Sequence, residues 1–166
     1  LEQILQKLHD TFDTSSVQEI TLEANPGEAP LQHLKDIRYL CVNRLSMGFQ
    51  SFDDKILKVL GRLHESEDCF KTFNNARKAG FDNINIDLIY DIPKQRVRDW
   101  KDDLFLGTSL EPEHISAYSL TDEQNTALHS MVQNKSVLMP SEKIDPMLTI
   151  EPLPCFKNHG IAAWHK

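Results

Sequence analysis

The chain has 166 residues, of which 40% are hydrophobic and 26% are charged, a composition typical of one globular domain or of part of a larger one. Its formal charge of −7 and its pI near 5.4 argue against a nucleic-acid-binding protein, which would need a basic face. No apolar run reaches the roughly 18–20 residues that a membrane span requires, and the first residues lack the layout of a signal peptide.

Hydrophobic periodicity predicts helices and strands that alternate along the first 120 residues. We expect helices over Leu1–Phe12, Leu31–Cys41, Asp53–Leu60, Ser66–Ala79 and Val97–Leu110, and strands over Glu19–Ala24, Asn43–Phe49, Asn83–Tyr90 and Glu113–Leu120. This order predicts an α/β fold with a parallel sheet. Four strands are too few to close a (β/α) barrel, so we expect residues 1–149 to form part of one. Residues 150–166 show no clear periodicity, and we expect a divergent or truncated tail there.

One polar residue stands at or near the end of each predicted strand: Glu23, Gln50, Asp87 and Thr121. Successive members are separated by about the length of one strand–helix–strand unit. The carboxyl ends of parallel strands meet at one edge of a sheet, where α/β folds bind their ligands. The pattern therefore predicts a polar small-molecule site at that edge.

Each of these residues also has a structural interpretation. Glu23 could cap the following helix or be a solvated charge, and Gln50 could be structural. Asp87 lies inside an apolar strand, where an unpaired carboxylate would cost several kcal/mol. It therefore needs either a protein partner such as Arg62 or a ligand. Arg62 suits a carboxylate, or it is simply a cation at a helix C-terminus.

The cysteines give no sign of a metal site or a disulfide framework. Cys41, Cys69 and Cys155 are far apart and odd in number, and the seven histidines show no ligand spacing. Reduced thiols in an intracellular protein are the simplest interpretation.

Six ordered segments resemble the radical S-adenosylmethionine proteins related to oxygen-independent coproporphyrinogen III oxidase. The resemblance runs from the first residue to about Thr149. Within that family, Glu-Ala-Asn-Pro at 23–26 and Leu-Gly-Arg-Leu-His at 60–64 resemble the heme-chaperone branch. The six segments are Ile20–Gly27, Asn43–Phe52, Leu60–His64, Ala79–Phe81, Asn85–Tyr90 and Ile115–Thr121.

The resemblance implies a cofactor site and a group of partners. Glu23, Gln50, Arg62 and Asp87 match the family's positions that hold S-adenosylmethionine, while Ile89 and Thr121 align with positions that line the same pocket. The branch implies binding of heme or a porphyrin and transfer of heme to client proteins. It also implies a cytoplasmic location, or a mitochondrial one in a eukaryote.

Some family features are missing from this sequence. The Cys-x3-Cys-x2-Cys loop that binds a [4Fe–4S] cluster, and the Gly-Gly-Thr-Pro segment after it, do not occur, so we expect a fragment that lacks the cluster-binding part. Asp91 and Arg96 replace the usual glycine and threonine, although Asp tolerates positive φ well enough for the turn to survive. His159 and Trp164 share only the outer spacing of the branch's terminal heme motif, which we interpret as coincidence.

Three functions remain open at this stage. The first is a heme chaperone, the second an enzyme that oxidatively decarboxylates coproporphyrinogen in tetrapyrrole synthesis, and the third an inactive, decayed fragment.

Overall fold

The computed structural model describes residues 1–140 and residue 144. Four parallel strands pair in sequence order β1-β2-β3-β4, with bounds β1 (Thr21–Ala24), β2 (Arg44–Gln50), β3 (Ile84–Tyr90) and β4 (His114–Ser119). The helices are α1 (Glu2–Thr11), α2 (Leu31–Tyr39), α3 (Asp54–Val59), α4 (Ser66–Lys78), α5 (Val97–Ser109) and α6 (Ala127–Gln133). The predicted α/β fold is confirmed, and each predicted element lies within about two residues of its observed position.

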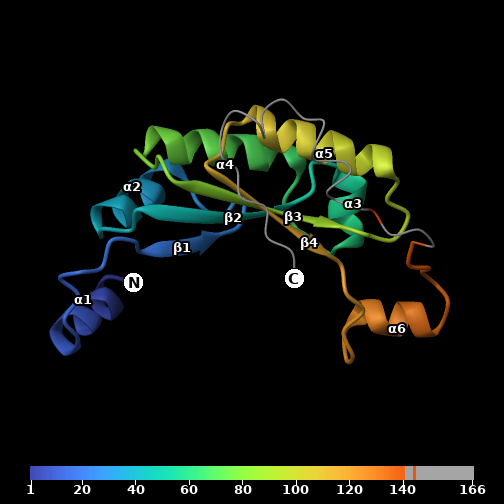
Figure 1. The fold of residues 1–166 in the computed structure, drawn as a ribbon, viewed down its shortest axis with the longest axis horizontal. Helices are drawn as coiled ribbons and strands as arrows, with labels where there is room; N and C mark the ends of the chain where they lie inside the picture. Colours follow the sequence, from blue (N-terminus) through green and yellow to red (C-terminus); the bar gives the residue numbers. More distant parts are fainter. Residues whose placement is uncertain (141–143, 145–166) are drawn as a thin grey trace.

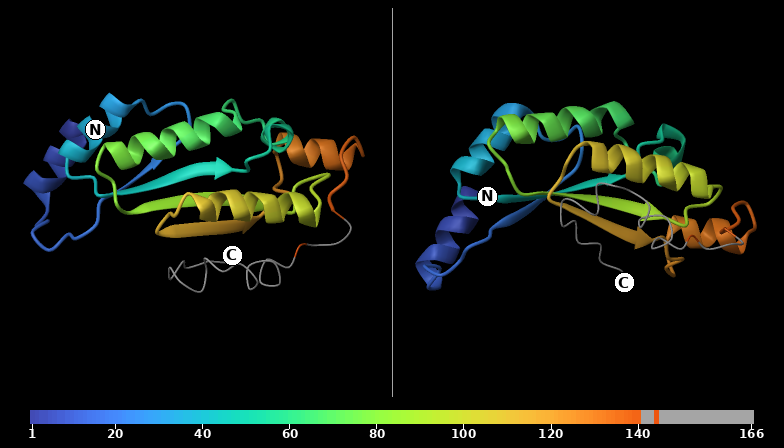
Figure 2. Two further views of the ribbon diagram at one scale, coloured as in Figure 1. Left: turned by 90° about the horizontal axis from the view of Figure 1, so that it is seen from above. Right: turned by 45° about the horizontal axis from the view of Figure 1, so that its top comes forward.

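Helices cover one face of the sheet. Figure 1 shows α2, α4 and α5 on the same side, α3 near the carboxyl ends of the strands, and α1 and α6 beyond the two ends of the sheet, and Figure 2 shows the same layers from two other directions. Alternate strand residues point to opposite faces of a sheet, and one set of alternate residues here joins a single apolar core with the helices. These strand residues are Leu45, Met47, Phe49, Ile84, Ile86, Leu88, Tyr90, Ile115 and Ala117.

Two helices differ from what the sequence predicts. In α1 the helix is confirmed, but it buries no residue, and Ile4 on its apolar face is 64% exposed. Helix α6 was not predicted; Thr126 caps it by accepting a hydrogen bond from the backbone N–H of His129 at 3.1 Å.

Two further sequence predictions concern the tail and membrane spans. The proposed tail over residues 150–166, including His159 and Trp164, lies outside the described residues. In the part of the chain that the structure describes, no helix is both long and apolar enough to cross a membrane.

Candidate functional site

The sheet face opposite the helices is polar. Asn85 is at its centre, donating from Nδ2 to Ser46 Oγ (2.9 Å) and to Asp87 Oδ1 (2.8 Å). Ser46 Oγ in turn donates to Asp87 Oδ2 (2.9 Å), and Ser116 Oγ donates to Asn85 Oδ1 (2.9 Å). This network joins β2, β3 and β4 on the face that a buried parallel sheet would normally fill with apolar side chains.

Asp87 therefore has protein partners, but not the one proposed from the sequence. Its carboxylate accepts hydrogen bonds from Ser46 and Asn85, and the suggested pairing with Arg62 is absent. The sequence left open a protein partner, with Arg62 as the example, or a ligand, and the example lay on a loop. The actual partners come from the same strand and from its neighbour, where alternation brings polar side chains together.

A cavity of about 400 Å³ opens at the carboxyl edge, or rim, of this polar face, and we call it the rim cavity. It brings together four of the predicted residues from different elements. The other two predicted residues, Ile89 and Thr121, are not in its lining; the Thr121 hydroxyl donates to Glu123 at 3.1 Å. The lining residues are Glu23, Ala24, Asn25, Ser46, Gly48, Gln50, Arg62 and Asp87.

Gln50 reaches this cavity from a strained turn. Its φ is +69°, and Ser51 N donates to Phe49 O at 2.8 Å, which together define the rare positive-φ form of the γ-turn. The pairing of β2 with β3 shifts by one residue just before it, between Met47 and Gln50. A Cβ at Gly48 would lie 2.8 Å from Gln50 Nε2, so the glycine makes room for the amide to fold over the strand.

Arg62 is placed by the end of α3. Gly61 has a φ of +69°, its N–H donates to Lys58 O (3.1 Å), and Arg62 N donates to Leu57 O (2.9 Å). This pair of bonds is the Schellman motif, which turns the chain sharply after a helix. Within the described residues the Arg62 guanidinium has no ion pair, which leaves it available for an anionic group in the cavity.

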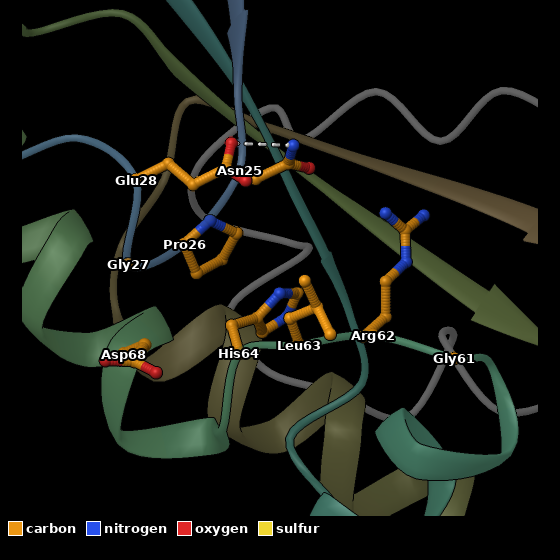
Figure 3. A pocket seen from close by; sticks show the side chains of 9 residues that line it. All are labelled: Asn25, Pro26, Gly27, Glu28, Gly61, Arg62, Leu63, His64 and Asp68. Atoms are coloured by element: carbon orange, nitrogen blue, oxygen red, sulfur yellow. Dashed lines mark hydrogen bonds between the residues drawn. The ribbon is translucent and has the colours of Figure 1, made fainter.

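A second, larger cavity of about 530 Å³ adjoins the first, because Asn25 and Arg62 line both. It lies between the loop after β1 and the loop after α3 (Figure 3). Asn25 donates to Glu28 across one side of it at 3.1 Å, and Arg62 points from its loop toward the strands. Leu63, at its mouth, is 99% exposed.

The two described cysteines do not suit a metal centre. Cys41 is exposed, whereas Cys69 is buried, and burial, followed by the nearby Asp68 carboxylate, raises the pKa of the Cys69 thiol to about 12. Cluster ligands are thiolates, so Cys69 in this setting is a core residue. No group of three or more His, Cys, Asp or Glu side chains in the described ranges could hold a metal ion, and Cys155 lies outside them.

Two features near the site clarify the sequence predictions. Asp91 adopts a φ of +60°, so the turn that usually carries glycine is retained. Its carboxylate accepts hydrogen bonds from Ser119 Oγ and Ile144 N, both at 2.8 Å. Ser46 was missed as a site residue, although counting back two residues from Gly48 along the strand would have placed it on the same face.

The fold belongs to a known class of protein. The family model described as the radical SAM superfamily matches residues 1–106, and the chain belongs to that superfamily. This confirms the resemblance seen in the sequence motifs.

The similar proteins include heme chaperones and a mitochondrial protein with a radical S-adenosyl methionine domain. Heme chaperone HemW of Bacillus subtilis (strain 168) is 33% identical over 165 residues, covering 96% of this chain and 44% of the relative. HemW of Haemophilus influenzae is 38% identical over 123 residues, covering 74% and 32%. The mouse mitochondrial radical S-adenosyl methionine domain-containing protein 1 is 36% identical over 151 residues, covering 91% and 32%. The chain thus spans less than half the length of these relatives.

Solved structures show the same fold. Escherichia coli coproporphyrinogen III oxidase (HemN), a radical SAM enzyme, superposes with a TM-score of 0.77 at 28% identity, covering 95% of this chain and 36% of the oxidase. Elp3 of Methanocaldococcus infernus superposes with a TM-score of 0.75 at 18% identity, covering 88% and 34%, and shows the fold alone.

Proposed function

We propose that the protein containing this chain binds S-adenosylmethionine at the carboxyl rim of the sheet and acts as a heme chaperone that passes heme to client proteins. The observation that carries the cofactor site is the convergence of Glu23, Gln50, Arg62 and Asp87 on one cavity. The HemW relatives support the heme function.

The chemistry of the cavity suits this ligand. S-adenosylmethionine carries an ammonium group, a carboxylate, a sulfonium and ribose hydroxyls. Glu23 offers carboxylate oxygens to hydroxyl or ammonium groups, and Arg62 offers a fork of donors to the carboxylate. Gln50 can donate and accept, and its amide has no hydrogen-bond partner among the described residues although the residue is only 8% exposed. A volume of about 400 Å³ lies in the range of small-molecule sites.

Asp87 plays a different part in the proposed site. Its two carboxylate oxygens already accept hydrogen bonds from Ser46 and Asn85, which fix the orientation of the group. Each oxygen has a further lone pair for a ligand hydroxyl. When bound, the cofactor supplies radical chemistry in this superfamily. The residues of this chain bind and orient it. Ile89 and Thr121 belong to the proposal as residues near the site rather than in the cavity lining.

Calorimetry of S-adenosylmethionine with the anaerobically reconstituted protein tests the site. Asp87→Ala should weaken binding by about tenfold or more, since a hydrogen bond to a charged group contributes about 1.5–3 kcal/mol. Ser109→Ala, on the exposed end of α5, is a matched control that should leave the affinity unchanged. Equal affinities for the wild type and Asp87→Ala, with the fold intact by circular dichroism, would remove Asp87 from the site.

A second function is supported by the superposition on coproporphyrinogen III oxidase. The two functions predict different activities for the same purified protein. A heme chaperone should bind hemin, visible as a shifted Soret band, and transfer it to an apoprotein acceptor. An oxidase should instead decarboxylate coproporphyrinogen III and release carbon dioxide. Turnover of coproporphyrinogen III without hemin transfer would establish the oxidase alternative.

A further inference from the structure

The strained turn at Gln50 is held from the helix-covered side of the sheet by one buried carboxylate. Asp103, on α5, is 2% exposed, and its Oδ1 accepts a hydrogen bond from Phe52 N at 2.6 Å. Both of its oxygens also accept from Ser51 Oγ, at 3.0 and 2.9 Å. The two residues that follow Gln50 are therefore tied to a helix distant in sequence.

The hydrogen-bond network extends from Ser51 to the start of helix α3. Ser51 Oγ also accepts a hydrogen bond from Asp53 N at 3.0 Å, and Asp53 caps α3 by accepting from Lys55 N at 2.7 Å. On the other side of the turn, His64 Nε2 lies 3.2 Å from Phe49 O, the same oxygen that closes the γ-turn. The backbone is thus held by hydrogen bonds on both sides of Gln50, at Phe49 and at Ser51 and Phe52.

Stability alone does not explain a carboxylate at this position. Burial raises the pKa of Asp103 to about 7 in spite of the hydrogen bonds from Phe52 and Ser51, and the nearby Asp53 and Asp99 raise it further. A neutral side chain would therefore be better tolerated in this place than an ionised one. What the carboxylate provides is two acceptor oxygens at a spacing that fixes Ser51 and Phe52 together.

We propose that Asp103 is a positioning residue for the rim cavity. By holding Ser51 and Phe52 it keeps the γ-turn closed, and the closed turn keeps the Gln50 amide over Gly48 and directed into the cavity. The identity of the ligand rests on the proposed function, whereas the role of Asp103 in positioning Gln50 does not.

Two readouts without ligand test the geometry. In nuclear magnetic resonance spectra of the protein containing this chain, Asp103→Ala should move the Gln50 side-chain amide signals. It should also speed amide exchange at Ser51 by about tenfold to a hundredfold, since a strained turn costs of order 1–3 kcal/mol. Asp103→Asn should restore both in part, because its amide oxygen can still accept from Phe52 N while its amide nitrogen replaces the second acceptor oxygen facing Ser51 Oγ. If Asp103→Ala does not fold, Ser51→Ala takes its place, with smaller changes expected in the same direction.

A double-mutant cycle with S-adenosylmethionine separates positioning from general destabilisation. Asp103→Ala should weaken binding about tenfold in the wild type but less than about twofold in the Gln50→Ala background, because Gln50 carries the effect. Equal effects in both backgrounds, or unchanged Gln50 signals in a folded Asp103→Ala variant, would overturn the proposal. Failure of the wild type to bind S-adenosylmethionine would reject the cofactor site, and the ligand-free spectra would still decide the role of Asp103.

Discussion

The two faces of the sheet come from the same strands but follow opposite rules. In β3, Ile84, Ile86 and Leu88 are fully buried against the helices. Their neighbours Asn85 and Asp87 point the other way and bond to each other and to Ser46. A change of one position along the chain thus separates a residue that holds the fold together from one available for a ligand.

This difference shows which face of the sheet stabilises the fold by burying apolar side chains. A parallel sheet in an α/β protein normally has apolar side chains on both faces, because helices cover both. In the described part of this chain the second face carries a hydrogen-bonded polar layer and ends at the rim cavity. The polar layer therefore points to function, whereas the apolar layer accounts for stability.

Replacing adjacent residues on β3 should give the largest contrast. Ile86→Ala should lower the free energy of unfolding by about 2–5 kcal/mol, because it leaves a cavity in a closed core. Asp87→Ala should lower it by only about 1–2 kcal/mol, because it removes the hydrogen bonds from Ser46 and Asn85 but leaves room for water from the adjoining cavity. Urea unfolding of both variants measures the difference. Equal losses would mean that the polar face is as important for stability as the core.

Asp103 is a carboxylate on the apolar side of the sheet, and it should make the free energy of unfolding depend on pH. Its pKa is raised from 3.8 to about 7, so between these values the folded state binds more protons than the unfolded state. Its contribution to stability is therefore greatest below pH 3.8 and is lost as the pH rises toward 7. Relative to Asp103→Asn, the wild type should lose up to about 1.4 kcal/mol per pH unit in this window. Urea unfolding at pH 5 and pH 8 measures this, and a flat or rising difference would contradict the assignment.

The residues around the rim cavity include two glycines whose backbone or small size shapes the site. Gly61→Ala should destabilise the protein by about 1 kcal/mol, because a φ of +69° is strained for alanine although no atom lies within 4 Å of the new Cβ. Gly48→Ala is the matched control. Its Cβ would lie 2.8 Å from Gln50 Nε2, the end of a flexible side chain, and 3.5 Å from Asn25 Oδ1, so we expect a smaller stability loss and a displaced amide. Thermal unfolding compares the two, and the reverse order would show that Gly48 is packed more rigidly than the geometry indicates.

A single hydroxyl on the polar face should matter least. Ser116→Ala removes one partly buried hydrogen bond to Asn85 Oδ1 on the side of the sheet opposite the helices and should lower the free energy of unfolding by about 0.5–1 kcal/mol. Ile115→Ala, its neighbour on the covered side, should lower it by about 2–5 kcal/mol. A loss for Ser116→Ala as large as that for Ile115→Ala would indicate that the polar network is closed off from water.

Much of this arrangement could be predicted from the sequence, for definite reasons. Strand positions follow from alternation and flanking turn residues, and parallel strands place Glu23, Gln50 and Asp87 at one edge whatever the details of packing. The partners of Asp87 could not be predicted, because they depend on the register of β2 against β3. The strained turn at Gln50 depends on a one-residue shift in that register and on Asp103, far along the chain. The burial of Asp103 could have been predicted, since it follows Trp100 by three residues on the apolar side of α5.

The order of the strands has a consequence for how the chain folds during synthesis. Each strand pairs with the one that precedes it in the sequence, so every strand that leaves the ribosome finds its neighbour already made. Among the strands that the structure describes, none has to insert between two others. The sheet can therefore grow from β1 to β4 by adding one strand and its covering helix at a time while the chain is being made.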